Sequence, residues 1–190
     1  EAADQGYYYC KAENEFGSLD SESASLAVKR MVVYWPFDGD YLDYSGEGND
    51  ITPYGTPVPE QWVDGVVPAE TGQAISTIGN RESAGETAPF NVAEYTNEIT
   101  VSLWLNWPGP DSFSTLNYRQ IVCSQDDSDN NFFLEIDNRD GWIQINAPGY
   151  SPYPFYQIQR DEWTHLAFTA SEDEVAAVYV NGSQYEITDP

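Results

Sequence analysis

Strict alternation of apolar and polar side chains between residues 99 and 107 limits the folds open to this chain. The odd-numbered positions are apolar: Ile99, Val101, Leu103, Leu105 and Trp107. The even-numbered positions are mostly polar and include Thr100, Ser102 and Asn106. Successive side chains of a β-strand point to opposite faces of the sheet. The period of two therefore predicts a strand with one buried face, and such a strand needs a second layer to pack against.

The same alternation returns in later stretches that are bounded by turn-forming residues. These stretches are Phe132–Ile136, Ile143–Ile145, Leu166–Phe168 and Val175–Val180. Asp140-Gly141 separates the first two, and Asn181-Gly182 closes the last with the strongest short hairpin signal. No long stretch has helical periodicity. The sequence therefore predicts an all-β fold of antiparallel strands in two packed sheets.

The balance of charge excludes two classes of partner. Asp and Glu number 32 against 7 Lys and Arg, which gives a formal net charge of −25. Such a surface repels phosphate backbones and anionic headgroups, so we expect no nucleic-acid partner. No apolar run approaches the roughly 18 residues of a membrane span, so we expect no membrane insertion within this segment. A solubilising coat explains the charge, and a saline or calcium-rich habitat is the alternative.

The first 30 residues contain a separate motif. Asp4-Gln5-Gly6-Tyr7-Tyr8-Tyr9-Cys10 resembles the F strand of immunoglobulin-like domains, Lys11–Gly17 the F–G turn, and the alternation of Ala24, Leu26 and Val28 the G strand. The resemblance implies that Tyr8 is a tyrosine corner and that Cys10 bridges to a cysteine outside the chain. We therefore expect residues 1–30 to be the C-terminal fragment of an immunoglobulin-like domain, with the boundary at Lys29-Arg30.

Three stretches of residues 31–190 resemble the laminin-G-like group of the concanavalin-A-like jelly rolls. They are Val33–Gly39 with Asp43–Asp50, Gly72–Ile75, and Trp163–Ala167 with Val178–Gly182. In that family they correspond to the first strand with its Gly/Asn loop, the second strand and a late hairpin. The resemblance implies an antiparallel jelly-roll β-sandwich over residues 31–190. Because the family continues past this hairpin, we expect the sandwich to be truncated at its C-terminal end.

The resemblance also sets the functional expectation. It implies a non-catalytic recognition or adhesion module that binds glycan or an extracellular protein, in a secreted or cell-surface protein. A structural spacer domain is one alternative, and a remnant of a concanavalin-A-like glycoside hydrolase is another.

An acidic loop is the candidate metal site. Asp38, Asp40, Asp43, Asn49 and Asp50 fall close together among glycines. Calcium takes several oxygen ligands from flexible loops, and related jelly rolls hold a structural calcium, so we consider a calcium site here. The alternative is that these residues simply form turns. A second acidic run, 126–131, lacks the glycine and distal Glu of an EF-hand, and a solvated hairpin tip is the better interpretation.

An aromatic stretch is the candidate ligand-binding surface. Residues 149–156 combine two prolines with Tyr150, Tyr153, Phe155 and Tyr156. Prolines exclude the stretch from a central strand and favour a loop that presents the rings. Such rings suit stacking on sugars or anchoring a protein, and the alternative is that they cap the open end of the sandwich.

The pattern Glu135-Ile136-Asp137 bears on whether the chain could be a glycoside hydrolase. Laminarinase-type hydrolases have carboxylates on alternate strand positions in a pattern like E-I-D-x-x-E, because retaining hydrolysis needs two carboxyls about 5 Å apart. Here Asn138, Arg139 and Asp140 follow, so the second carboxylate is missing from its position. The chain has 1 His, His165, which we interpret as a strand residue, and 2 Cys, which argues against zinc. We therefore expect no enzymatic activity.

Overall fold

The computed structural model of the chain describes residues 6–26, 31–53, 62–76, 85–88, 98–110, 118–124, 132–147, 150–171 and 175–185. Strands dominate, as the sequence predicts, and the one helix among these residues is the single turn α1 (Pro68–Thr71). No helix in the described ranges has the length and hydropathy needed to cross a membrane. The all-β prediction is confirmed.

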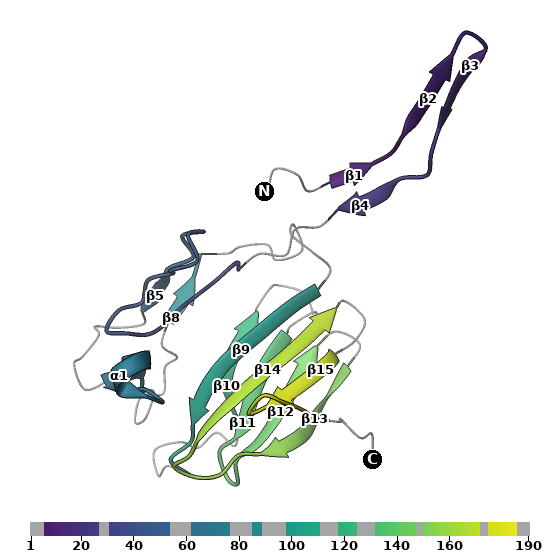
Figure 1. Cartoon of the computed structure of the whole chain (residues 1–190). Helices are drawn as coiled ribbons and strands as arrows, with labels where there is room; N and C mark the ends of the chain where they lie inside the picture. The colour runs from purple at the N-terminus through teal and green to yellow at the C-terminus, as the bar shows by residue number, and fades with distance from the viewer. Residues whose placement is uncertain are drawn as a thin grey trace.

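Two four-stranded antiparallel sheets form the body of the molecule (Figure 1). The first sheet runs in the order β10 (Tyr118–Ser124), β11 (Phe132–Asp137), β12 (Trp142–Ala147) and β13 (Tyr150–Gln157). The second runs in the order β16 (Ser183–Tyr185), β15 (Val175–Val180), β14 (Trp163–Ser171) and β9 (Glu98–Asn106). Figure 1 shows the second sheet in front of the first, so each sheet has one inner and one outer face.

The core lies between the inner faces of the two sheets. The register of the strands places the apolar residues of neighbouring strands opposite one another. Leu103 lies opposite Leu166, and Leu166 opposite Val180. In the first sheet Leu134 lies opposite Ile145. Ten buried residues from both sheets and the segment after β13 form one cluster: Leu134, Ile136, Ile143, Ile145, Phe155, Ile158, Leu166, Phe168, Val178 and Val180. The opposite parity is thereby directed outward.

Two predicted turns are confirmed. Asn181 and Gly182 have φ values of 49° and 79°, the paired positive values of a two-residue hairpin turn, and they connect β15 to β16. Asn138–Asp140 form a turn between β11 and β12, which Gly141 completes with a φ of 81°. The sequence therefore placed both reversals correctly.

The first strand predicted within Val33–Gly39 is wrong. Residues 31–50 contain no strand, and Phe37 has a left-handed φ of 56°. The carboxylate of Asp43 accepts the backbone N–H of Tyr34, so a side chain takes the place of a neighbouring strand there. The predicted second strand exists as β7 (Gln73–Ile75), but it pairs with β6 (Trp62–Asp64) rather than with either large sheet.

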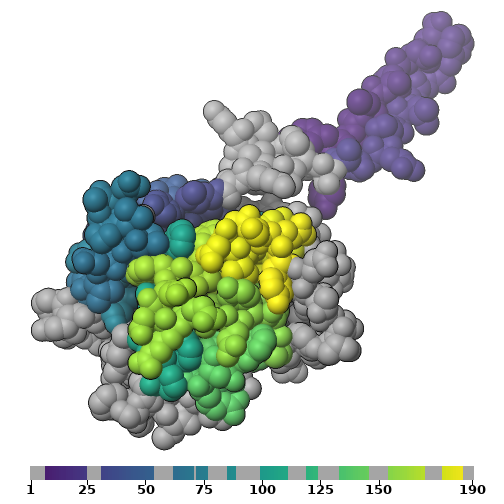
Figure 2. Space-filling view, turned by 60° about the horizontal axis from the view of Figure 1, so that its bottom comes forward, coloured from purple at the N-terminus to yellow at the C-terminus, as the bar shows by residue number. Residues whose placement is uncertain are grey.

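Small two-stranded units complete the described part. β5 (Ile51–Pro53) pairs with β8 (Gly85–Thr87), and with β6 and β7 they lie beside the two large sheets. Figure 2 shows this segment, in indigo to blue, against the flank of the green and yellow strands. Among the described residues, the small strands contribute no member to the buried core cluster.

An N-terminal hairpin extends away from the sheets (Figure 1). β1 (Gly6–Tyr8) pairs with β4 (Ala24–Leu26), and β2 (Lys11–Asn14) pairs with β3 (Gly17–Asp20). The described side chains of this hairpin are all exposed, so it has no core of its own. Its reversal lies at Glu15–Phe16, within the predicted F–G turn. The immunoglobulin-like assignment of residues 1–30, and the division at residue 31, stay predictions.

The aromatic stretch around residues 150–156 is an edge strand rather than a loop. Both prolines lie within β13, which has a partner on one side only in the described sheet. Its pairing with β12 is interrupted by register shifts at two places. Proline is tolerated at a sheet edge and at bulges, because no ladder hydrogen bond is needed there.

Replacing a buried side chain of the core tests this architecture. Phe168 is 1% exposed and lies in the core cluster, so Phe168→Ala leaves a cavity and should lower the free energy of unfolding by about 3–5 kcal/mol. Val63→Ala is the control, because Val63 is 41% exposed on a small outlying strand. Urea unfolding measures both. If both variants lowered the free energy of unfolding by the same small amount, the result would contradict a core between these sheets.

Candidate recognition site on the outer face of the first sheet

Glu135 and Asp137 project from β11 onto the outer face of the first sheet, because they alternate with the core residues Leu134 and Ile136. Both acids are nevertheless nearly buried, with exposed fractions of 8% and 6%. Burial of a carboxylate is costly unless it is paired or hydrogen-bonded. The partners of these two acids therefore decide what the face can do.

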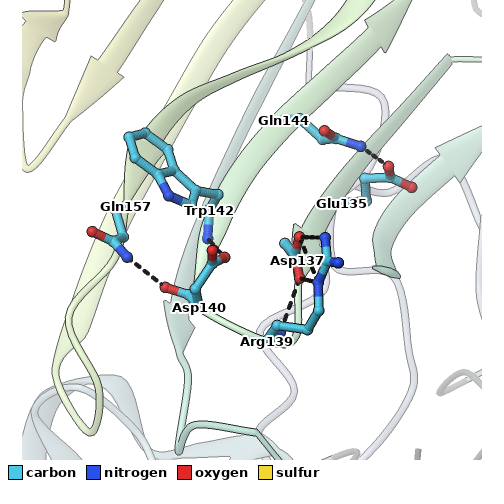
Figure 3. A network of polar contacts seen from close by, with 7 residues as sticks. All are labelled: Glu135, Asp137, Arg139, Asp140, Trp142, Gln144 and Gln157. Carbon is cyan, nitrogen blue, oxygen red and sulfur yellow. Dashed lines mark hydrogen bonds and ion pairs between the residues drawn. The ribbon is translucent and has the colours of Figure 1, made fainter. Parts of the chain in front are cut away.

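Asp137 is held by Arg139 (Figure 3). The backbone N–H and the Nε of Arg139 each donate to Oδ1 of Asp137 at 2.9 Å, and Nη2 of Arg139 forms an ion pair with Oδ2. The side-chain hydrogen bonds of Arg139 lower the pKa of Asp137 against the effect of burial, which raises it; the backbone N–H and the charge of Arg139 add to the lowering. Asp137 is thus a neutralised, fully engaged carboxylate.

Glu135 is bonded to an amide instead. Gln144 of β12 lies directly opposite Glu135 in the register, and its Nε2 donates to Oε1 of the acid. Figure 3 shows this pair beside the Asp137–Arg139 pair on the same face. A neutral amide satisfies a hydrogen-bond acceptor without supplying a counter-charge.

The turn after β11 is built so that Arg139 folds back. The N–H of Gly141 donates to the carbonyl of Asp137 at 2.8 Å and closes the turn. A Cβ at Gly141 would lie 2.6 Å from Cζ3 of Trp107, so only glycine fits there. The indole N–H of Trp107 donates to the amide oxygen of buried Asn138 at 3.4 Å. The second sheet therefore positions the turn through Trp107, the residue that follows β9.

An exposed rim lies at the end of this face. Trp142 of β12 is 38% exposed, and its backbone N–H donates to Oδ1 of Asp140 at 3.4 Å. Gln157 of β13 lies opposite Trp142 and donates from Nε2 to the carbonyl of Asp140 at 2.8 Å. With the half-exposed guanidinium of Arg139, these side chains offer a ring, an amide and a cation to solvent (Figure 3).

The chemistry of this face differs from that of a two-carboxylate hydrolase. Such an enzyme needs one carboxyl free to donate a proton and another free to attack or to activate water. Asp137 is ion-paired with Arg139. Asp140 accepts the N–H of Trp142 through its carboxylate and the amide of Gln157 through its backbone carbonyl. Arg139 lies in the turn after β11 and reaches Asp137 from there.

The acidic loop is organised around Asp43. Its two carboxylate oxygens accept the backbone N–H groups of Tyr34, Ser45 and Asn49 and the hydroxyl of Ser45, at 2.7–2.9 Å. Burial alone would raise the pKa of Asp43, but these four hydrogen bonds together lower it to about 2. Asp43 therefore acts as the anchor of an irregular segment.

The other predicted ligands also bond within the chain. Asp50 accepts the N–H of Asp43, Asp38 accepts the N–H of Gln73, and Asp40 accepts the N–H of Leu42 and the hydroxyl of Tyr44. The amide of Asn49 donates to the carbonyl of Val32. Across the described ranges, no three Asp, Glu, His or Cys side chains are grouped as a metal site. The donor set fits turn formation, and calcium here stays a prediction.

Of the predicted aromatic ligand residues, Phe155 is buried in the core, and Tyr156 packs against the core. Both rings contact Tyr185 of β16, at centroid distances of 6.2 and 5.7 Å. They therefore close the sandwich between the edges of the two sheets. Tyr150 and Tyr153 lie on β13, and their side chains fall outside the described part. A binding role for the four stays a prediction.

Several further predictions concern single residues or segments. Cys10 and Cys123 are both free and exposed. A partner for Cys10 outside the chain stays a prediction. The second acidic run, 126–131, lies outside the described residues.

Sequence reasoning missed Trp142, Gln144 and Gln157 as members of one face. The available signal was the opposite parity of the strand Trp142–Ala147, in which Ile143 and Ile145 are the buried residues. Gln157 could not be found this way, because a register shift between β12 and β13 decides which residue lies beside Trp142.

Comparison with known proteins decides the family. The model of the concanavalin A-like lectin/glucanases superfamily, of laminin G type, matches residues 79–189, more than half of the chain. The chain belongs to this superfamily. Comparisons with curated proteins and with solved structures give no match. Domains of this laminin G type bind carbohydrate or protein ligands and are generally non-catalytic, although the same fold also occurs in glycosidases.

Removing the guanidinium tests the state of Asp137. In Arg139→Met the acid stays buried and loses its cation, so its pKa should rise above the ordinary carboxyl value. The unfolding free energy at neutral pH should fall by about 1–3 kcal/mol, near the lower end because Arg139 is half exposed. Since Arg139 lowers the pKa of Asp137, the pair stabilises at neutral pH, and this contribution is lost as the pH falls through the folded-state pKa.

Carboxyl ¹³C NMR titration and urea unfolding measure the two effects. Arg160→Met is the matched control, because Arg160 forms a different, exposed ion pair, with Asp161 at 3.3 Å. An unchanged Asp137 titration in Arg139→Met would show that the ion pair does not form.

The loop anchor makes a second prediction about pH. Asp43 titrates at about 2 in the folded chain against an ordinary value of 3.8, so its hydrogen bonds stabilise the fold above that ordinary value. This contribution is lost as the pH falls from the ordinary value toward 2. The difference in unfolding free energy between the native chain and Asp43→Ala should therefore be constant near neutral pH and shrink across that window. A difference independent of pH would contradict the anchor.

Proposed function

We propose that the chain is a non-catalytic glycan-recognition module of an extracellular protein. The observation that carries this proposal is the engagement of Asp137 by Arg139 on the outer face of the first sheet. In this arrangement the acids organise the face, and the exposed rim around Trp142 makes the contacts. Membership of a superfamily whose laminin G-type domains bind carbohydrate or protein supports the class of function.

The rim has the chemical groups that a sugar ring needs. The C–H face of a pyranose packs on an aromatic ring, and Trp142 offers its indole at the surface. Gln157 and Arg139 lie to either side of Asp140 and Trp142 and donate hydrogen bonds to hydroxyl groups. Both are donors carried by the sheet or by a tight turn, which favours a fixed geometry.

The proposed location follows from the family and from the charge. Laminin G-like domains are typically extracellular. A net charge of −25 keeps such a module soluble and suppresses contact with anionic headgroups. A protein ligand at the same rim is the competing outcome, and the binding experiment separates it from a glycan.

Affinity electrophoresis of the full chain through gels containing a neutral β-glucan, a galactomannan or a xylan tests the proposal. The chain should be retarded by at least one of them, and Trp142→Ala should weaken that retention by about tenfold, because the stacking ring is lost. Exposed Tyr34, outside both large sheets, supplies the control Tyr34→Ala. Reducing-sugar release from the β-glucan should be absent. Release that Glu135→Gln abolishes would make the chain a hydrolase instead.

A further inference from the structure

At the positions that the structure describes, the outer face of the second sheet carries almost no charge. The residues that point outward from this sheet are polar, aromatic or alanine. They are Thr100, Ser102, Trp104 and Asn106 on β9; Trp163, His165, Ala167 and Thr169 on β14; Ala177 and Tyr179 on β15; and Gln184 on β16. Among the described positions of this face, Glu98 at the far end of β9 is the carboxylate. A chain with 32 Asp and Glu thus has almost none at the described positions of this face.

A preorganised aromatic pair stands on this face. Trp104 is 48% exposed, and its ring lies beside that of His165 with centroids 5.0 Å apart at an angle of 54°. Nε2 of His165 is 2.9 Å from Oγ of Ser102. The backbone N–H and carbonyl of His165 are both bonded to Asn181, at 2.9 Å each. The hairpin turn therefore fixes His165, and His165 fixes the indole.

Small side chains lie next to this pair. Ala167 lies between Ser102 and Tyr179 in one cross-strand row, and Thr169 lies between Thr100 and Ala177 in the next. Because alternate residues of a strand share a face, these rows adjoin the row of Trp104 and His165. The face therefore has a low floor of alanine and hydroxyl groups, bordered by the Trp104 indole and the Tyr179 ring. Figure 1 shows this face toward the viewer, on β9, β14 and β15.

We infer that this face is a second glycan-binding surface, specific for neutral chains, centred on Trp104. A ring that is exposed, held in place and bordered by hydroxyl and amide groups stacks on a pyranose and bonds its hydroxyls. A carboxylated or sulfated chain is excluded by the surrounding negative charge, whereas an uncharged chain meets no repulsion on a charge-free floor. A basic protein partner would need acids within the face, and Glu98 alone lies at its end among the described positions.

This inference rests on the proposed function for the class of ligand and adds a separate site. Trp104 and Trp142 lie on the outer faces of opposite sheets. A long polysaccharide that reaches one face cannot stack on the other without wrapping around the sandwich. Two independent faces therefore let one module hold two chains, or two turns of one chain, and the gain in avidity comes without further contacts.

The same affinity gels test the second site. Trp104→Ala should weaken retention by the neutral polysaccharide that binds the native chain by about tenfold, and Trp104→Phe should restore part of it because a ring remains. The double variant Trp104→Ala with Trp142→Ala should lose retention entirely. Alginate, an anionic polysaccharide, should retard none of the variants. Unchanged far-UV circular dichroism and melting temperature confirm that each variant is folded.

The outcomes separate this site from the first. Retention that Trp142→Ala weakens and Trp104→Ala leaves unchanged would overturn the second site and keep the proposed function. Retention that Trp104→Ala alone weakens would keep the second site and move recognition away from the first face. If none of the neutral polysaccharides retards the chain, both sites are overturned. If alginate retards the chain as strongly as the neutral polysaccharides do, the specificity for neutral chains is overturned.

Discussion

The packing of two inner sheet faces against each other is the constraint on which the rest of the structure depends. Leu134, Ile136, Ile143 and Ile145 of the first sheet meet Leu166, Phe168, Val178 and Val180 of the second in one cluster. Burial of apolar surface is the main favourable term in folding, so this contact fixes which parity of every strand points inward. The alternate residues of each strand must then point outward, because a shift of the register by one residue would move every side chain to the opposite face of the sheet.

The outward parity carries the chemistry, and the two outer faces differ. On the first sheet it holds two buried acids, one neutralised by Arg139 and one bonded to Gln144, with an exposed rim around Trp142. On the second it holds an exposed Trp104 beside described positions that carry no charge. Neither face has two unengaged carboxylates among its described residues. The same fold also occurs in glycosidases, and we propose that in this chain it supports two binding surfaces.

How much could be predicted from the sequence depended on whether a property was local. Alternation predicted β9, β11, β14 and β15, and Asn181-Gly182 predicted its hairpin, because period and turn chemistry are properties of neighbouring residues. The strand expected within Val33–Gly39 failed because the side chain of Asp43, farther along the chain, binds the backbone of Tyr34. The loop expected around Tyr150 failed because proline is compatible with an edge strand that is bulged.

The candidate sites were less accessible to sequence reasoning for the same physical reason. The loss of the second catalytic carboxylate was readable from Arg139, but the ion pair that makes Asp137 structural depends on a turn closed by Gly141 and Trp107. The clustering of Asp38, Asp40 and Asp43 in sequence suggested one metal site, whereas each carboxylate bonds to a different part of the backbone or to a neighbouring hydroxyl. The uncharged face around Trp104 arises only when register brings three strands side by side.

The most direct measurement is the response of the 6 tryptophan indole N–H signals in a ¹H–¹⁵N NMR spectrum on addition of a soluble neutral β-glucan or whichever neutral polysaccharide retards the chain. Two outward-facing recognition surfaces predict that the signals of Trp104 and Trp142 move, that the signal of Trp107, which bonds to buried Asn138, stays in place, and that the polysaccharide is not shortened. Shifts that spare both Trp104 and Trp142, or shortening of the polysaccharide during the titration, would contradict the account.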